Sequence, residues 1–170
     1  AIGFVPNNAL GKDHLELWKN GAYSVDKYQQ TSDPDVYAVG DCATIYSNAL
    51  RDKTYIALAS NAVRTGIVAG HNIGGTKLEG AGVQGSNAIC VFGRKLASTG
   101  LSLNAAKKAG LDVEYTDYED TQRPAFMKEN ADVKIRIVYE KSTRRVVGAQ
   151  LSSTEDISMA IHMFSLAIEE

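Results

Sequence analysis

Apolar and polar side chains alternate in the second half of the chain, and this alternation predicts β-strands. Four apolar residues recur at every second position, with Lys134 and Arg136 between them: Val133, Ile135, Ile137 and Tyr139. A period of two is typical of a strand with one buried face. Four further segments are predicted strands: Ala88–Phe92, Arg94–Ser98, Val113–Tyr118 and, after a turn at 141–145, Val146–Leu151. Short turns between successive strands predict an antiparallel sheet.

Two helices are predicted from apolar spacing and from the residues that begin and end them. The first runs over residues 54–73 and is closed by Gly74 and Gly75. The second is short, with Ser102 as its N-cap and Gly110 as its stop.

A third helix is predicted at the end of the sequence. The segment 152–155 matches a capping box, with Ser152 as N-cap and Glu155 three positions later. The apolar residues that follow share one helical face: Ile157, Ile161, Phe164 and Ile168. No stop signal precedes residue 170, and the first residues open directly on an apolar segment. We therefore expect the chain to be part of a longer protein.

The first half of the chain predicts a different kind of structure. Residues 1–34 are expected to be mostly irregular, and Val36–Val39, between Pro34 and Gly40, is a predicted buried strand. The glycine-rich segment 75–85 is the predicted linker. The expected fold is therefore part of an α/β nucleotide-binding architecture, then a linker, then an antiparallel α+β module.

Two features of the first half suggest a ligand, and each has an alternative explanation. Asp41 follows the predicted strand, at the sheet edge where α/β folds bind ligands, but it could equally cap its own turn. Ala62, Gly66 and Gly70 give the first helix a face of small residues. Each glycine inside a helix lowers helix stability by about 1 kcal/mol relative to alanine. Because a close contact would offset this loss, we expect either another segment or a flat cofactor to approach this face.

Composition narrows the class of protein. The 170 residues are 44% hydrophobic and 22% charged, with a formal net charge of −2, as in ordinary globular domains. This balance argues against a general nucleic-acid binder, and no apolar run is long enough to span a membrane. Cys42 and Cys90 are the two cysteines, and no Asn-x-Ser/Thr acceptor occurs, which favours a cytoplasmic location. The cysteines and histidines show no metal-ligand spacing, so no metal site is expected.

Three segments carry a resemblance to a known family. The segment 31–43, which contains Tyr37-Ala38-Val39-Gly40-Asp41, resembles the second FAD-binding motif of the flavin-dependent pyridine nucleotide–disulfide oxidoreductases. Residues 56–64 and 70–73 are similar to the helix that backs the flavin in that family. Residues 1–7 resemble its crossover from the NAD domain to the FAD domain. Within the family, the sequence most resembles the branch of NADH oxidases, NADH peroxidases and coenzyme A-disulfide reductases. The run Gln122–Met127 points more narrowly to the water-forming NADH oxidases.

The resemblance implies an α/β fold in two parts. Residues 1–85 would be the C-terminal part of an FAD-binding (Rossmann-like) domain, and residues 86–170 an α+β dimerisation domain truncated at its C-terminus. The implied cofactor-binding residues are Gly40, Asp41, Leu58, Ala59 and Ser60. Gly40 and Asp41 would contact the ribityl chain of FAD, and the other three, at the helix start, would contact the isoalloxazine ring.

The resemblance also implies the partners of the subunit. Residues 86–170 would form a homodimer, with Arg123, Pro124 and Phe126 as candidates to face the partner's active site; a plain surface loop is the alternative for these three. The family's redox cysteine and its Gly-x-Gly-x-x-Gly motif are absent from this sequence, so no catalytic residue is expected in it.

The function implied for the parent protein is FAD-dependent NADH oxidation. Electrons would pass from NADH through FAD to O2, giving water, and the chain would supply flavin contacts and the subunit interface without being active or retaining FAD alone. NADH peroxidase and coenzyme A-disulfide reductase, which use other small-molecule acceptors, are the close alternatives. A non-catalytic dimerisation or interaction module is the alternative of another class.

Overall fold

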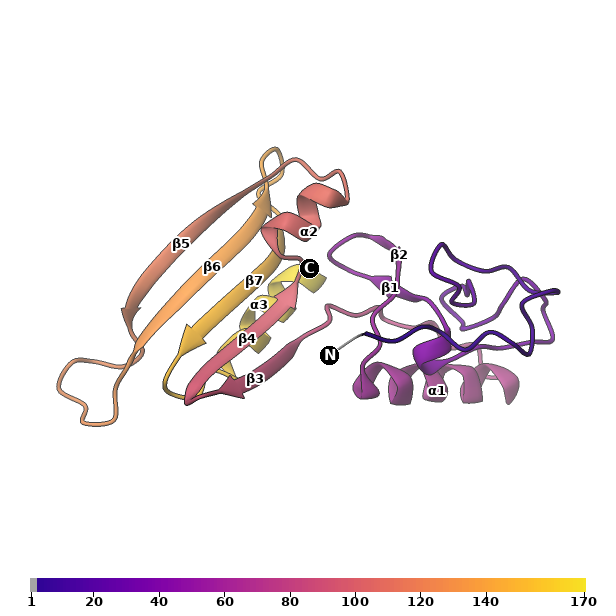
Figure 1. Ribbon diagram of the computed structural model, residues 1–170, viewed down its shortest axis with the longest axis horizontal. Coiled ribbons are helices and arrows are strands. Elements are labelled where there is room, and N and C mark those ends of the chain that lie inside the picture. Colours follow the sequence, from indigo (N-terminus) through magenta and orange to yellow (C-terminus); the bar gives the residue numbers. More distant parts are fainter. Residues whose placement is uncertain (1–2) are drawn as a thin grey trace. The chain divides into compact units, whose positions relative to one another are not determined.

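The computed structural model of the protein describes residues 3–170, and the chain divides into two units (Figure 1). One unit consists of the residues up to Ser47 together with Arg51–Val83. The other consists of Asn48–Leu50 together with Gln84–Glu170.

The first unit contains little regular structure apart from one long helix. Its elements are the single 3-10 turn η1 (Gly40–Cys42), strands β1 (Ile45–Ser47) and β2 (Asp52–Thr54), and helix α1 (Ala59–Ile73). Strands β1 and β2 form an antiparallel pair. Residues 3–34 are mostly irregular, as predicted. A small core holds them together, consisting of Tyr23, Val25, Ala38 and Ala43, with Leu15, Leu17 and Cys42 packed against it.

The strand predicted at Val36–Val39 is wrong. The segment has extended backbone at Val39, but its one bridge is the pairing of Gln30 with Tyr37. The Ala38 N–H also donates to the Gln29 carbonyl at 3.1 Å. A run of β-branched and aromatic residues favours extended backbone, whereas a strand needs a continuous ladder with a neighbour, which residues 3–170 do not supply here.

Helix α1 confirms the predicted helix, although it begins five residues later than expected. Leu58 is its N-cap, in extended conformation, and Gly74 is its C-cap, followed by Gly75 at φ +85°. Its buried side chains lie four residues apart: Asn61, Thr65 and Ala69. The neighbouring segment expected against Gly66 and Gly70 is not found within residues 3–170, because a Cβ at either position would meet no heavy atom within 4 Å.

The second unit is a five-stranded antiparallel sheet with two helices, as predicted. Its elements are β3 (Asn87–Val91), β4 (Arg94–Gly100), α2 (Leu103–Lys108), β5 (Val113–Thr121), β6 (Asp132–Glu140), β7 (Val146–Ser153) and α3 (Ala160–Glu169). The strand order is β3-β4-β7-β6-β5. Ser102 caps α2 as expected, since its hydroxyl accepts a hydrogen bond from the Ala105 N–H at 3.2 Å.

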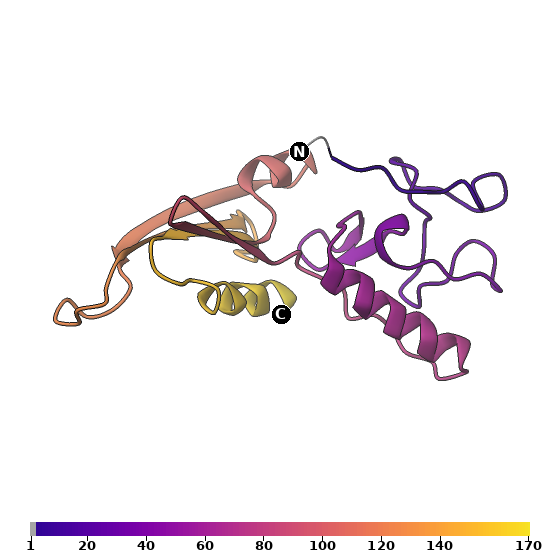
Figure 2. The ribbon, with the colours of Figure 1, turned by 60° about the horizontal axis from the view of Figure 1, so that its bottom comes forward.

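Helices α2 and α3 cover opposite faces of the sheet (Figure 2). The core under α3 consists of Ala97, Val133, Ala149, Leu151, Ile157 and Ile161. The smaller core beside α2 consists of Ala106, Val113, Val138 and Val147. An irregularity between Val138 and Tyr139 leaves Val147 of β7 without a ladder partner, and the alternation in β6 changes there. Val138 lies on the sheet face opposite the predicted apolar face, and it is fully buried because it packs in the core beside α2.

The capping box predicted at Ser152 is wrong, but the apolar face of the helix is right. Ser152 and Ser153 are the last residues of β7, where they pair with Leu96 and Lys95 of β4. Because the strand ladder continues through both serines, α3 begins later, at Ala160. The predicted apolar residues still face the core: Ile157, Ile161 and Ile168 are buried, and Phe164 packs beside them.

Candidate functional site

The turn η1 places Gly40 and Asp41 directly beside α1. Gly40 has φ +70°, a left-handed conformation that favours glycine, and a Cβ at this position would lie 3.5 Å from the Ala62 Cβ. Its carbonyl accepts the Ala43 N–H at 3.1 Å, which closes the turn. The local backbone therefore requires glycine before the aspartate.

Two side-chain hydrogen bonds connect this turn to α1 and to the segment that leads into it. The Gly40 N–H donates to the Thr65 hydroxyl at 3.1 Å. The Tyr55 hydroxyl donates to the Asp41 backbone carbonyl at 2.7 Å. Burial, and after it the negative charge of Asp41, raises the pKa of Tyr55, so this phenol stays protonated at neutral pH. The position of the Asp41 backbone is thus fixed at both ends.

The Asp41 side chain is exposed. Within residues 3–170 its carboxylate has no hydrogen bond or ion pair, so no such bond caps its own turn. An ionised carboxylate held on a rigid turn can accept charge-assisted hydrogen bonds from hydroxyl groups of a ligand.

The start of α1 is the second feature of the site. Leu58 is half-buried, whereas Ala59 and Ser60 are exposed. No side chain caps this end, and its first turn contains no acidic residue. The first N–H groups of a helix lack intrahelical partners, so this end can receive partial negative charge from a ligand. The structure therefore brings all five predicted cofactor-binding residues onto α1, its N-cap and the turn packed beside it.

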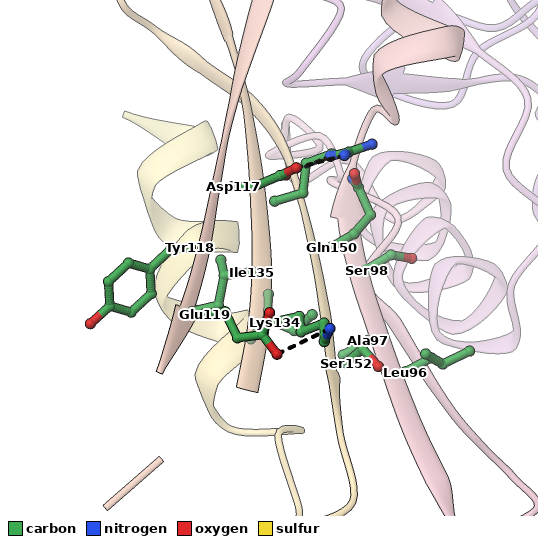
Figure 3. Close-up of a pocket in the computed structure, with 12 residues that line it drawn as sticks. Leu96, Ala97, Ser98, Asp117, Tyr118, Glu119, Lys134, Ile135, Gln150 and Ser152 are labelled. Carbon is green, nitrogen blue, oxygen red and sulfur yellow. Dashed lines mark hydrogen bonds and ion pairs between the residues drawn. The ribbon is translucent and has the colours of Figure 1, made fainter. Parts of the chain in front are cut away.

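A hollow of about 700 Å³ in the second unit lies on the five-stranded sheet, between β4, β7, β6 and β5 (Figure 3). Its charged residues neutralise one another. Arg136 forms a two-pronged ion pair with Asp117, at 2.7 and 2.8 Å, and Lys134 pairs with Glu119 at 3.0 Å. The hydrogen bond from Arg136 holds the pKa of the Asp117 carboxyl below its usual value. These pairs connect β5 to β6.

The residues predicted to face a partner subunit lie in the long loop between β5 and β6. Phe126 is 87% exposed. Arg123 is held within the loop, because its guanidinium donates to the Glu129 carbonyl at 2.9 Å. The loop thus presents an aromatic side chain, and nothing within residues 3–170 covers it.

Other kinds of site find no support in the part of the chain that the structure describes. Residues 3–170 contain no group of three His, Cys, Asp or Glu that could hold a metal ion. Cys42 is half-buried, with its thiol donating to the Val39 carbonyl, and Cys90 is exposed on β3; both are free. No described helix is long and apolar enough to cross a bilayer.

Sequence reasoning missed Thr65 and Tyr55, the two residues that hold the Gly40–Asp41 turn. Thr65 follows Asn61 by one helical turn, and this spacing alone could have indicated a polar position on the inner face of the helix. Nothing in the sequence indicates that Tyr55 reaches the Asp41 carbonyl.

Comparison with known proteins supports the resemblance found in the sequence. The family model for pyridine nucleotide-disulphide oxidoreductase matches residues 1–66, and the model for the dimerisation domain of the same family matches residues 86–170. An NADH oxidase of Lactococcus lactis is 66% identical over 99% of this chain, and one of Streptococcus pyogenes is 59% identical over the whole chain.

A solved structure is similar to this chain in both sequence and fold. The water-forming NADH oxidase from Lactobacillus brevis, bound to NADH, is 38% identical, covers 99% of this chain and superposes with a TM-score of 0.95. This chain spans 38% of the length of each of these three proteins. The dimerisation-domain model matches half of the chain, and the fold agrees with that of a solved relative along nearly its whole length. The chain therefore belongs to the pyridine nucleotide-disulphide oxidoreductase family.

Proposed function

We propose that this chain is the flavin-contacting and subunit-contacting part of an FAD-dependent NADH oxidase, which passes electrons from NADH through FAD to O2 and forms water. The observation that carries the proposal is the position of the Asp41 carboxylate on a turn packed against α1. The similarity to proteins named as NADH oxidases supports the choice of activity.

The residues of the candidate site fit a flavin. The exposed Asp41 carboxylate would accept hydrogen bonds from the ribityl hydroxyls, and Gly40 would allow close approach of the backbone. Leu58, Ala59 and Ser60 would lie against the isoalloxazine ring, where the N–H groups of the helix start favour negative charge. FAD, when bound, supplies the hydride and electron transfer. The chain itself orients the cofactor and contributes no proton-transfer group.

We further propose that residues 1–85 belong to the FAD-binding domain and residues 86–170 form the homodimer interface. The match of residues 86–170 to the family's dimerisation domain supports this assignment. Helix α3 buries one face in the core and leaves Met159, Met163 and Leu166 at least 60% exposed. Exposed apolar side chains at helical spacing are typical of a surface that packs against another chain. The two free cysteines support the cytoplasmic location expected from the sequence.

The proposed activity is tested by steady-state kinetics of the full-length parent. NADH consumption is measured with O2, hydrogen peroxide and coenzyme A disulfide as separate acceptors. We expect turnover with O2, with twice as much NADH consumed per O2 as in a reaction that stops at hydrogen peroxide. Turnover with only peroxide or only the disulfide would reassign the protein to the corresponding alternative. A parent that purifies without flavin and consumes no NADH with any acceptor would refute the proposal.

A further inference from the structure

Besides the backbone bond from Ala43 to Gly40 that closes the turn, two side chains hold the backbone on either side of Asp41. The N–H that precedes it, from Gly40, bonds the hydroxyl of Thr65, and the carbonyl that follows it, from Asp41 itself, accepts from the hydroxyl of Tyr55. Both side chains belong to α1 or to the short segment leading into it. The turn and the helix therefore form one hydrogen-bonded unit.

Thr65 is placed for this contact by the helix. It is 6% exposed, and its hydroxyl lies 2.9 Å from the Asn61 carbonyl one turn earlier. A hydroxyl has one proton and two lone pairs. It can therefore donate its proton to Asn61 and accept the Gly40 N–H at the same time. Valine has the same shape as threonine but can do neither.

Tyr55 makes the second contact from the segment between β2 and α1. Its hydroxyl reaches the Asp41 carbonyl at 2.7 Å, and its ring lies beside Phe4, with a centroid separation of 6.4 Å. Phenylalanine at this position would keep the ring and remove only the hydrogen bond. The two contacts can thus be deleted separately with little change in side-chain shape.

We propose that Thr65 and Tyr55 are positioning residues for the flavin, acting through Asp41. By fixing the turn to α1, they keep the Asp41 carboxylate at a constant position relative to the start of the same helix. One FAD molecule can then be contacted at its ribityl chain by Asp41 and at its ring by the helix start. This inference rests on the proposed function, because it assumes that both features bind the same cofactor.

The test is a double-mutant cycle on FAD affinity in the full-length protein. Apoprotein is titrated with FAD, and flavin fluorescence gives the dissociation constant. The proteins compared are the wild type and the single variants Thr65→Val, Thr65→Ser, Tyr55→Phe and Asp41→Ala. Two double variants complete the cycle, in which Asp41→Ala is combined with Thr65→Val or with Tyr55→Phe. Thr65→Val and Tyr55→Phe are each expected to weaken binding about two- to tenfold, the range for one lost hydrogen bond. Thr65→Ser, which keeps the hydroxyl, restores affinity.

The cycle separates positioning from a general loss of structure. Residues that act through Asp41 cause no further loss once Asp41 is alanine. Equal losses in both backgrounds, or unchanged affinity in both single variants, would overturn the inference. If Thr65→Val does not fold, Tyr55→Phe alone decides between these results. Thr143→Val and Tyr118→Phe, which remove exposed hydroxyls in the second unit, are matched controls expected to leave affinity unchanged.

Failure of the inference can be distinguished from failure of the proposed function. If Asp41→Ala weakens FAD binding while Thr65→Val and Tyr55→Phe do not, the flavin site stands and the positioning role is rejected. If Asp41→Ala leaves FAD affinity unchanged, the proposed site itself is rejected, and the positioning role with it.

Discussion

The backbone N–H of Gly40 donates a hydrogen bond to the hydroxyl of Thr65, with 3.1 Å between nitrogen and oxygen. This bond joins a turn with a left-handed glycine to the inner face of a helix 25 residues further along the chain. It gives the exposed Asp41 carboxylate a defined place beside α1, which an isolated turn could not do.

Tyr55 makes the site sensitive to alkaline pH. Its pKa is raised above 10.0, mainly by burial and then by the charges of Asp41 and Cys42. A raised pKa means that the folded state favours the neutral phenol, so this contribution to stability is present below pH 10 and is lost as pH rises through the folded pKa. We expect the free energy of unfolding to fall more steeply above pH 10 in the wild type than in Tyr55→Phe. Denaturant titrations of both proteins across this range measure the difference, and parallel pH profiles would contradict it.

Gly148 on β7 is required by close packing. A Cβ at this position would overlap the backbone of Leu101. Gly148→Ala is therefore expected to destabilise the chain by about 1–3 kcal/mol or more, the usual range for overpacking. Thermal unfolding measures the change. Gly66→Ala is the matched control, since its Cβ meets no atom within 4 Å, and it should be neutral or stabilising. An unchanged melting temperature for Gly148→Ala would contradict the packing described here.

Arg145 carries the least exposed ion pair of the chain among residues 3–170, with Glu140 at 2.7 Å and side chains only 12% and 20% exposed. The same guanidinium donates to the Asn48 and Ala49 carbonyls at 3.3 and 3.1 Å. Arg145→Ala is expected to cost about 2 kcal/mol, because it leaves these acceptors without their donor. Arg144→Ala, whose side chain is 69% exposed, is the neighbouring control and should change stability little. Equal effects of both substitutions on denaturant midpoints would refute this ranking.

Secondary structure was predicted best from the sequence where it depends on residues that are close together along the chain. The strands from Ala88 to Leu151 were recognisable because each pairs with neighbours through short turns or a regular alternation. The strand at Val36–Val39 failed because an extended preference does not supply a pairing partner. The capping box at Ser152 failed because pairing of β7 with its neighbours overrode the local helix signal.

In the candidate site, too, features set by nearby residues were predicted and features set by tertiary packing were not. Gly40 and Asp41, and the residues at the start of α1, could be selected from the family resemblance, whereas apolar spacing alone placed the start of the helix five residues too early. The hydrogen bond between Gly40 and Thr65 could not be predicted, because it depends on how the turn packs on the helix. Val138 was missed for a similar reason, since its burial depends on α2 packing over the sheet face opposite the predicted apolar one.

The exposed apolar stripe of α3 is expected to stabilise the proposed homodimer. Met163 is 73% exposed and lies between Met159 and Leu166 on this stripe. Met163→Asp places a charge there, and burying an unpaired charge is strongly unfavourable. We expect light scattering of the full-length protein to show a shift from dimer to monomer, with no shift for Thr143→Asp on an exposed turn. An unchanged dimer in Met163→Asp would place the interface elsewhere.

The FAD affinity of Asp41→Ala in the full-length protein tests the account most directly. Asp35→Ala is the control, since Asp35 is an exposed carboxylate of the same segment. Loss of a charge-assisted hydrogen bond predicts at least about tenfold weaker FAD binding for Asp41→Ala, while Asp35→Ala should bind FAD like the wild type. Equal affinity of Asp41→Ala and the wild type would show that this carboxylate does not hold the flavin.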